Sequence, residues 1–424
     1  MKRICVFLLT VVLLLADHWS SAAAADSQLI TSVAAIYEYN DNIRLNAENE
    51  LSDSIYTVSP KIELVREAER LTLRVDGTAE FYDYQEYDQF DDIDQWYNAA
   101  MDYRPTERWQ IGLDGHASVD SQPDRDISET GLVLSNVQRK RLNAAASTRY
   151  ALSEIISGGL SVAFNRENFD DPQTSDRKDY HAALSLTRNL EEWLVRTSGS
   201  VRMAYSRYEF ERSFTRIRNQ GAVTVNDSVD QTNSVDVYAL TVGTQSALTE
   251  RFTFTVDAGG RYSHSQSDST SLLTFDPPLP PLASRQEESA DSWGFVGSMG
   301  LDYRGERSRL SLLLSQDLQP VSGENSTANR TTVRLSGSVR LLEKLNARLA
   351  AQWYRNASDQ NDAGQEKIDT RTWNVRGGLQ WVLNDAFSLE GEYAYTVYED
   401  RDAGSTAYRN KVLVQLTARH DWLE

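Results

Sequence analysis

Apolar and polar residues alternate along most of this chain. Between positions 70 and 82, every second residue from Leu71 onward is apolar or small, and the residues between them are polar. The stretches 109–119 and 251–262 repeat this pattern. Because successive side chains of a β-strand point to opposite faces, a period of two predicts strands with one apolar face. No comparable stretch carries the spacing of an amphipathic helix.

The connections between these stretches alternate in length. Short links are predicted near 67–69, 105–107, 151–154, 190–192, 248–250, 304–306, 343–344 and 384–385. Longer polar links are predicted near 40–54, 85–94, 120–136, 168–178, 209–233, 266–290, 319–328, 357–369 and 399–407. This rhythm is typical of bacterial outer-membrane barrels. We therefore predict an all-β, transmembrane, antiparallel up-and-down barrel of about 18 strands (16–18), with short periplasmic turns and long extracellular loops.

Soluble β-sandwiches are the alternative architecture, because their strands alternate too. Sandwich strands usually hold about 5–6 residues, whereas strands of about 10 residues match a tilted crossing of the hydrocarbon layer. Aromatic residues such as Trp109, Trp381 and Tyr408 lie near predicted strand ends. They fit the aromatic girdles that mark the two membrane interfaces, which favours the membrane barrel.

Two positions interrupt the regular pattern. Pro60 lies inside a predicted strand and removes a backbone donor, which predicts a bulge or a strand end there. In the predicted strand 234–248, Val235 and Val237 fall on the face opposite Tyr238, which a bulge would explain.

The start of the chain has the pattern of a secretory signal peptide. An apolar run, Ile4–Ala16, follows two basic residues and precedes small residues that end at Ala25. We predict that residues 1–25 are the signal and that 26–424 form a single barrel domain. The one cysteine, Cys5, then lies in the signal, so the mature chain has no disulfide and no thiolate metal site.

The composition narrows the classes of function. The chain carries 43 Lys and Arg against 62 Asp and Glu, which gives a formal net charge of −19. Nucleic-acid binding requires a basic face, so we expect no nucleic-acid partner. A content of 40% hydrophobic residues argues against an intrinsically disordered acidic chain.

If the apolar faces meet lipid, the polar faces line the lumen. An arginine guanidinium binds a carboxylate or a phosphate through two parallel hydrogen bonds, so an arginine-lined lumen suits anionic solutes. Alternatively, these arginines pair with wall carboxylates and brace the barrel. The predicted lumen-lining residues are Arg70, Arg74, Arg149, Arg202, Arg261, Arg334, Arg348, Arg376, Arg419, Asp76, Glu80, Asp257 and Glu390.

Residue patterns for catalysis are weak. No histidine belongs to a metal-binding spacing such as H-E-x-x-H, and there is no G-x-S-x-G motif. We therefore predict no enzyme activity, no cofactor and no metal site. A barrel hydrolase that uses His116 or His181 is the alternative.

The opening of the mature chain carries a family resemblance. It reads Tyr39-Asn40-Asp41-Asn42, then Ser52-Asp53, then Val58-Ser59-Pro60. This resembles the outer-membrane β-barrel porins that are often encoded in exopolysaccharide gene clusters. The resemblance implies a barrel of about 18 strands that passes a secreted polysaccharide together with a periplasmic export protein. One departure is the end of the chain, where Trp422 is followed by Leu423 and Glu424 rather than closing on an aromatic residue.

The leading expectation is therefore a porin-like conduit in the bacterial outer membrane that exports an extracellular polysaccharide through a polar, arginine-lined lumen. Its expected partners are outer-membrane lipid, lipopolysaccharide and a periplasmic polysaccharide-export protein. Two alternatives stay open: a nonspecific or small-solute porin, and a barrel that sheathes a periplasmic partner such as a multihaem cytochrome. The predicted loops 209–233 and 266–290 are long enough to fold into the pore or to cap it.

Overall fold

The computed structural model describes residues 26–121, 127–132, 137–220, 223–276, 280–358 and 367–423. The predicted signal, 1–25, lies outside the described residues. The strands are β1 Asp26–Asn40, β2 Asp53–Ala68, β3 Leu71–Tyr84, β4 Asp92–Thr106, β5 Trp109–Asp120, β6 Arg139–Ala151, β7 Ile156–Phe169, β8 Asp176–Asn189, β9 Thr197–Gln220, β10 Val223–Ala247, β11 Phe252–Asp276, β12 Leu282–Arg304, β13 Ser308–Pro320, β14 Thr327–Leu342, β15 Leu345–Ala357, β16 Asp369–Val382, β17 Phe387–Asp400 and β18 Ser405–Asp421. A short 3₁₀-helix, η2 Asp88–Phe90, precedes β4.

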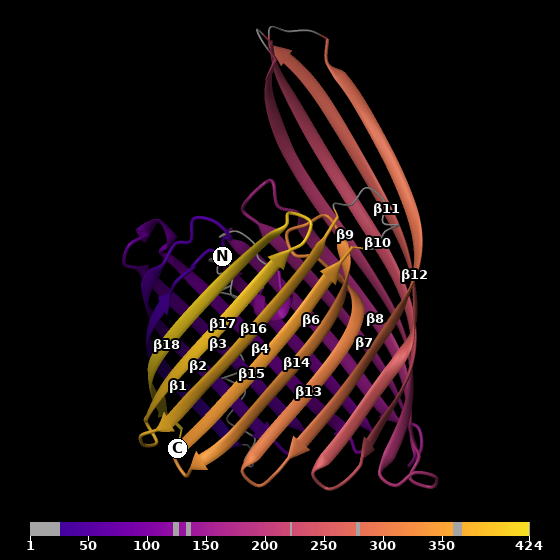
Figure 1. Cartoon of the computed structure of the whole chain (residues 1–424). Helices are drawn as coiled ribbons and strands as arrows, with labels where there is room; N and C mark the ends of the chain where they lie inside the picture. Colours follow the sequence, from indigo (N-terminus) through magenta and orange to yellow (C-terminus); the bar gives the residue numbers. More distant parts are fainter. Residues whose placement is uncertain are drawn as a thin grey trace.

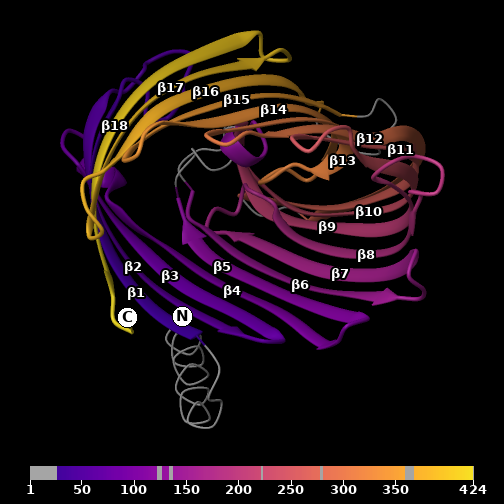
Figure 2. The same ribbon diagram turned by 90° about the horizontal axis from the view of Figure 1, so that it is seen from below.

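These strands form one closed 18-stranded antiparallel sheet (Figures 1 and 2). Each strand pairs with its neighbours in sequence, and β1 closes the ring on β18, from Ile30 opposite Asp421 to Asn40 opposite Lys411. The predicted antiparallel barrel of about 18 strands is confirmed. The start of β1 and the end of β18 lie at the same end of the barrel as the connections 69–70 and 343–344. Outer-membrane barrels orient this end towards the periplasm.

The outward face of the sheet is apolar. Val33, Ile62, Leu184 and Leu240 are all exposed, and they alternate with inward polar residues. A continuous apolar band of this kind is unfavourable in water but meets hydrocarbon in a bilayer, and a closed sheet leaves no lipid-exposed strand edge.

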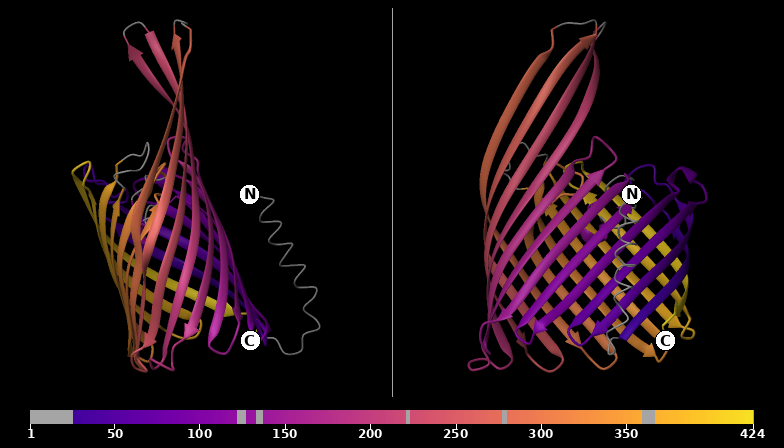
Figure 3. Two further views of the ribbon diagram at one scale, coloured as in Figure 1. Left: turned by 90° about the vertical axis from the view of Figure 1, so that its right-hand side faces the viewer. Right: turned by 180° about the vertical axis from the view of Figure 1, so that it is seen from behind.

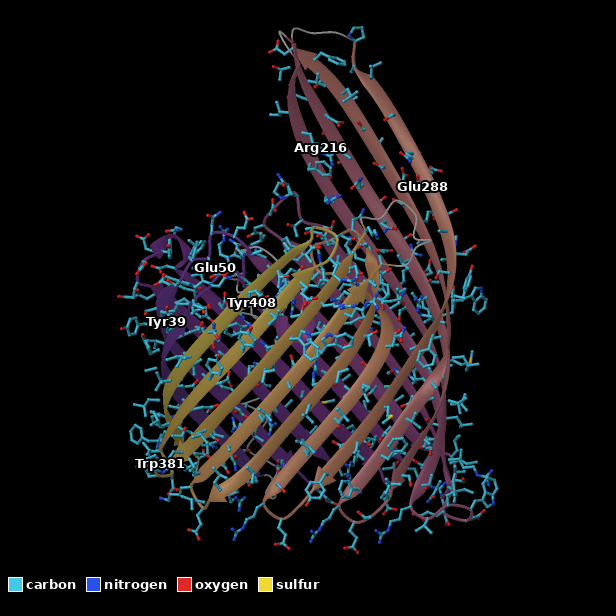
Figure 4. The ribbon with its side chains drawn as sticks, in the orientation of Figure 1. Tyr39, Glu50, Arg216, Glu288, Trp381 and Tyr408 are labelled. Carbon is cyan, nitrogen blue, oxygen red and sulfur yellow. The ribbon has the colours of Figure 1, made fainter. Side chains whose placement is uncertain are left out.

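Aromatic residues lie at both rims of this apolar band. Figure 4 shows Tyr39 and Tyr408 near the extracellular rim and Trp381 near the periplasmic rim. On β11, Phe252 and Tyr262 mark the two rims and are separated by the ten residues that a tilted crossing needs. The chain is therefore a transmembrane β-barrel of the bacterial outer membrane.

Among the residues that the structure describes, no helix is long and apolar enough to cross a membrane.

Strands β9 to β12 rise far above the rest of the barrel (Figures 1 and 3). They hold 24, 25, 25 and 23 residues, and β10 pairs with β9 and β11 along nearly its full length. We call the parts of β9 to β12 that extend beyond the extracellular rim of the other strands the fin. The predicted loops 209–233 and 266–290 are therefore mostly strand, and they neither fold into the pore nor cap it. Both faces of the fin are polar, so its sequence lacks the alternation that reveals a strand.

The structure has no bulge at either of the two positions where the sequence pattern is irregular, Pro60 and the strand around Val235. The registers of β10 with β9 and with β11 run without a shift, and Val235 and Val237 point inward while Tyr238 points outward. The inward valines pack against Leu318, which is why this strand is apolar on both faces. Pro60 keeps its place opposite Val33 of β1, and the pairing of β2 with β3 resumes in the same register beyond it.

Candidate functional site: a constricted lumen

The lumen is crossed by part of the connection between β5 and β6. Residues 127–129 form a turn of helix, and the segment 127–132, which we call the crossbar, lies inside the ring beside β14 and β15 in Figure 2. Strands β6 and β15 are half the ring apart, so the crossbar reaches from one wall to the opposite wall.

Hydrogen bonds fix the crossbar to the far wall. The hydroxyl of Tyr354 donates to the carbonyl oxygen of Ser128 at 2.6 Å, and the amide of Asn356 donates to that of Thr130 at 3.1 Å. The hydroxyl of Thr372 donates to the carbonyl of Gly131. These three side chains satisfy three backbone carbonyls of an irregular segment, which need hydrogen-bond partners when they are buried.

Glycine at position 131 allows the close contact with β15. Gly131 has a φ of +69°, and a Cβ there would overlap Tyr354, lying 2.6 Å from its Cγ. Only glycine combines a left-handed backbone with this approach at low cost.

Apolar contacts hold the crossbar at its first and last residues. Ile127 packs with Leu45 and Ala407, and Leu132 packs with Val321 and Ala328. All six side chains are buried. The crossbar is therefore a constriction with two small apolar clusters of its own. Buried apolar contacts of this kind stabilise a segment against local unfolding.

The connection between β13 and β14, residues 321–326, also leans inward. The backbone N–H of Ser175 donates to the carbonyl of Gly323 at 2.9 Å, and the amide of Asn233 donates to that of Asn325 at 2.9 Å. These bonds join the β13–β14 tip to β10 and to the β7–β8 connection, which are separated from it around the ring. The extracellular half of the lumen is consequently narrowed by two chain segments.

A buried ion ladder supports the wall below the crossbar. Arg139 contacts Asp120 at 2.6 Å and Glu167 at 3.3 Å, and Arg177 contacts Glu167 at 3.3 Å and Asp179 at 3.1 Å. Asp120, Arg139 and Glu167 are each at most 2% exposed. Charges buried this deeply require partners, and strands β5 to β8 supply them alternately.

The ladder continues into the crossbar. Arg141 of β6 contacts Glu167 at 3.0 Å and reaches Glu129 of the crossbar at 2.8 Å. The near wall therefore holds the crossbar by an ion pair, while the far wall holds it by hydrogen bonds.

A cavity of about 620 Å³ lies beside the crossbar. Its charged lining is balanced, with Arg74, Arg141, Arg166 and Arg177 against Asp76, Asp114, Glu129 and Glu167, and its amides come from Asn98, Asn143 and Asn165. Arginines and acids alternate here, so this level of the lumen favours polar solutes of either charge.

Several predicted lumen residues come together on the walls of four cavities. Arg74 and Asp76 line the cavity beside the crossbar. Arg149 and Arg202 line a second cavity. Arg348 and Arg376 line a third on the opposite wall, where Arg348 contacts Gln380 at 2.6 Å and Glu390 at 3.5 Å. Asp257 shares a further cavity with Arg202.

Other predicted lumen residues have mainly structural contacts. Arg334 donates to the Tyr354 hydroxyl at 2.9 Å, and Glu80 accepts from Ser59 and Tyr82. Arg261 is only 1% exposed and donates to Ser263 and Asn329.

Two predicted residues lie at the periplasmic end. Arg70 lies in the turn between β2 and β3, outside the strands, and donates to the carbonyl of Pro105 at 3.0 Å. Arg419 lies near the end of β18, on the face opposite Val414 and Leu416.

The histidines lie in polar pairs. His116 Nδ1 is 2.7 Å from the amide oxygen of Asn98, and His181 Nδ1 is 2.9 Å from the hydroxyl of Ser206. The described residues contain no group of three His, Cys, Asp or Glu side chains that could hold a metal ion.

Sequence reasoning missed the residues that define the constriction. Glu129 and Gly131 lie in a predicted extracellular loop, and Tyr354 has the same alternating context as any other wall residue. The bonds from Tyr354 to Ser128 and from Thr372 to Gly131 join positions more than 200 residues apart, and no local pattern reveals such a pairing.

No protein-family model and no curated protein matches the sequence. Solved structures with a similar barrel exist. The ferric-catecholate import receptor Fiu from E. coli K12 has a TM-score of 0.49 at 8% identity, covering 93% of this chain and 82% of its own. OccAB3 from Acinetobacter baumannii has a TM-score of 0.42 at 9% identity, covering 94% and 100%. The ferric enterobactin receptor PfeA from Pseudomonas aeruginosa has a TM-score of 0.42 at 10% identity, covering 94% and 82%. At this identity and these TM-scores, the likenesses carry no argument about function.

Proposed function

We propose that this chain is an outer-membrane diffusion pore for small polar solutes, with the crossbar as its size filter. The observation that carries this proposal is the attachment of segment 127–132 to both walls, through Arg141 on one side and Tyr354, Asn356 and Thr372 on the other. A barrel of 18 strands is wide enough for an aqueous channel. A fixed segment across it leaves narrower passages on either side.

The lining supports polar rather than apolar solutes. The cavity beside the crossbar is lined by amides and by charges of both signs. These groups bind water when the cavity is empty of solute, and they can replace those hydrogen bonds by bonds to the hydroxyls of a solute at little cost in free energy. His116 lies against the amide of Asn98, and His181 lies against the hydroxyl of Ser206 and the ring of Tyr208, so the proposal gives neither histidine a catalytic role.

Export of a polysaccharide is the second candidate, and it is the function that the family resemblance implies. The amides of Asn98, Asn143 and Asn165 beside the crossbar favour it, because amides bind sugar hydroxyls well. A polymer would require the crossbar to leave the lumen while it passes. A periplasmic export protein, a polysaccharide substrate and lipopolysaccharide contacts belong to this proposal, and the partner-sheath alternative stays a prediction.

The test is to replace residues 127–132 by a Gly-Ser linker of equal length. Conductance of the purified barrel in planar bilayers should rise several-fold, and liposome swelling should extend to larger sugars. A matched control replaces 401–404, the β17–β18 turn, and should leave both unchanged. Equal conductance of the crossbar variant and the native barrel would rule out a size filter.

A second experiment separates the two candidates. The gene is deleted in the native host, and polysaccharide is measured at the surface and in the periplasm. Periplasmic accumulation with surface loss, restored by the intact gene, supports polysaccharide export. Unchanged amounts in both compartments leave the small-solute pore.

A further inference from the structure

A row of outward aromatic residues marks the outer membrane interface on β9 to β12. Ring centroids are 5.1 Å apart for Tyr205 and Tyr238, 6.4 Å for Tyr238 and Tyr262, and 5.1 Å for Tyr262 and Trp293. Amphipathic rings collect at the headgroup level. Positions of β12 between Trp293 and Tyr303 therefore lie within the hydrocarbon layer.

Pairing between β12 and β13 ends inside this layer. It runs from Arg304 opposite Arg309 to Gly297 opposite Gln316 and stops there, although both strands continue. Residues 293–296 of β12 therefore pair with β11 alone, at the depth of the outer leaflet. An open sheet edge at membrane depth occurs only where protein covers it or where it lines a water-filled cavity.

Above Gly297 the two strands overlap instead of pairing. Leu318 of β13 packs against Tyr208, Phe210, Val235 and Val237, which lie on the inward faces of β9 and β10. Upper β13 consequently lies inside the base of the fin, and the wall overlaps itself at this seam. Figure 1 shows β13 curving away from β12 where β12 continues into the fin.

A cavity joins the seam to the lumen. It measures about 610 Å³, and its lining includes Val296, Gly297 and Gln316 at the seam and His181 and Ser206 on the far side. The seam therefore opens inward onto polar space. On the outside, Trp293 and Phe295 of the same strand edge are 78% and 53% exposed.

One side chain bridges the overlap. Arg261 of β11 reaches across β12 and donates to Asn329 of β14, and it also donates to Ser263 at 3.2 Å. Gly294 of β12 makes room for it, because a Cβ there would lie 2.7 Å from the guanidinium carbon. We call this the Arg261 clasp. It joins the two sides of the seam by side-chain bonds where backbone pairing is missing.

We propose that the β12–β13 seam is a lateral aperture, through which an amphiphile passes between the lumen and the outer leaflet of the membrane. The alkyl tail leaves past Phe295 and Trp293 while the head group stays in the cavity. Asp114, Asp257 and Asp317 outnumber Arg202 among the charged groups of that cavity. The head group is therefore hydroxylated or cationic rather than anionic. This route is independent of the proposed passage of polar solutes along the barrel axis.

The test locks the seam with a disulfide. If the register of β12 and β13 continued, Val296 would lie opposite Asp317. A disulfide in the V296C/D317C double variant would therefore join the two strands one residue beyond the last backbone pair. The G300C/L313C variant joins two residues that already face each other outside this cavity, and it serves as the matched control. The reduced form of each variant controls for the lost side chains.

The probe is dodecyl maltoside with a diazirine on its sugar, added to the protein in phospholipid vesicles and read by mass spectrometry. Labelling of His181 and Ser206 in the native barrel is expected. Oxidised V296C/D317C should lose it at least tenfold relative to the reduced form of the same variant, while oxidation of the control variant leaves its labelling unchanged. Labelling of outward residues alone, or equal labelling of the locked barrel, overturns the aperture.

Two further experiments, one with the R261A variant and one with an anionic probe, test the proposal independently of the disulfide. If the V296C/D317C disulfide does not form, the R261A variant replaces it, and loss of the clasp should raise lumen labelling several-fold. Unchanged labelling in R261A then contradicts the proposal. Dodecyl sulfate with the same photoreactive group tests the head-group class, and labelling as strong as that by the maltoside refutes the stated preference.

Discussion

Gly131 shows how a single residue sets the width of the lumen. Its positive φ and its contact with Tyr354 both exclude a side chain. We expect Gly131→Ala to push the crossbar off β15, because backbone strain of about 1–3 kcal/mol is added to a direct overlap. Single-channel conductance in planar bilayers should increase. Gly404→Ala is the matched control, since Gly404 has a φ of +67° with nothing within 4 Å of the added Cβ. Equal conductance of the two variants would show that the contact between Gly131 and Tyr354 does not set the width of the lumen.

Arg261 is a second position where one side chain joins distant strands. Arg261→Lys keeps the charge but replaces the planar fork that donates to both Ser263 and Asn329. We expect the barrel to lose about 1–3 kcal/mol, the cost of leaving a buried acceptor without a donor. The heat-induced mobility shift on gels measures this as a lower unfolding temperature. Arg285→Lys in the fin should change little, because its ion pair with Asp268 is exposed.

At the scale of elements, the buried ion ladder makes strands β5 to β8 interdependent. Glu167 contacts Arg139, Arg141 and Arg177. Glu167→Gln removes the central negative charge and leaves these arginines with fewer partners in a buried site. Removing one partner of a buried pair costs about 3–5 kcal/mol, so a marked drop in the unfolding temperature is expected.

The control for this variant is Asp170→Asn. Asp170 pairs with Lys140 at 2.7 Å, but both side chains are more than 40% exposed. An exposed pair contributes about 0–1 kcal/mol. If the two variants unfold at the same temperature, the ladder does not brace the wall.

Elements differ in how well the sequence predicts them. The alternation that begins at Leu71 identifies β3 because one face meets lipid and the other meets water. The fin has no such contrast. Both of its faces meet water, and pairs such as Ser271 with Asp227 connect strands without leaving a hydrophobic signal. In β10 the sequence pattern predicts a bulge that does not exist. Val235 and Val237 are apolar although they face inward, because they pack against Leu318.

At the scale of the whole molecule, the barrel could be predicted and the constriction could not. Alternation is a local property, and it fixes which residues face lipid. The crossbar depends on Tyr354 meeting Ser128 across the ring, and neither residue carries a pattern that selects the other. The predicted arginines illustrate the same limit. Arg74 and Arg348 line cavities, whereas the similarly placed Arg261 is buried in the clasp.

Charge along the lumen is uneven, and this predicts ion selectivity. The cavity beside the crossbar is balanced, but the one near the periplasmic end is lined by four arginines and two acids: Arg304, Arg309, Arg348, Arg376, Asp302 and Glu392. A lumen of one predominant sign concentrates counter-ions. We expect the periplasmic mouth to favour anions. The triple variant R309A/R348A/R376A should therefore shift the reversal potential in a salt gradient towards cations.

The control for this shift must alter charge without touching the lumen. Arg216 lies in the fin, far above the pore (Figure 4), so R216A changes the net charge of the protein but not the field inside the barrel. Its reversal potential should match that of the native protein. High salt should reduce the difference between the triple variant and the native barrel, because the Debye length falls to about 3 Å at 1 M. A triple variant with unchanged selectivity would mean that the arginines near the periplasmic end do not set the ion selectivity, because Glu129 and Arg141 at the crossbar neutralise each other and offer no preference of their own.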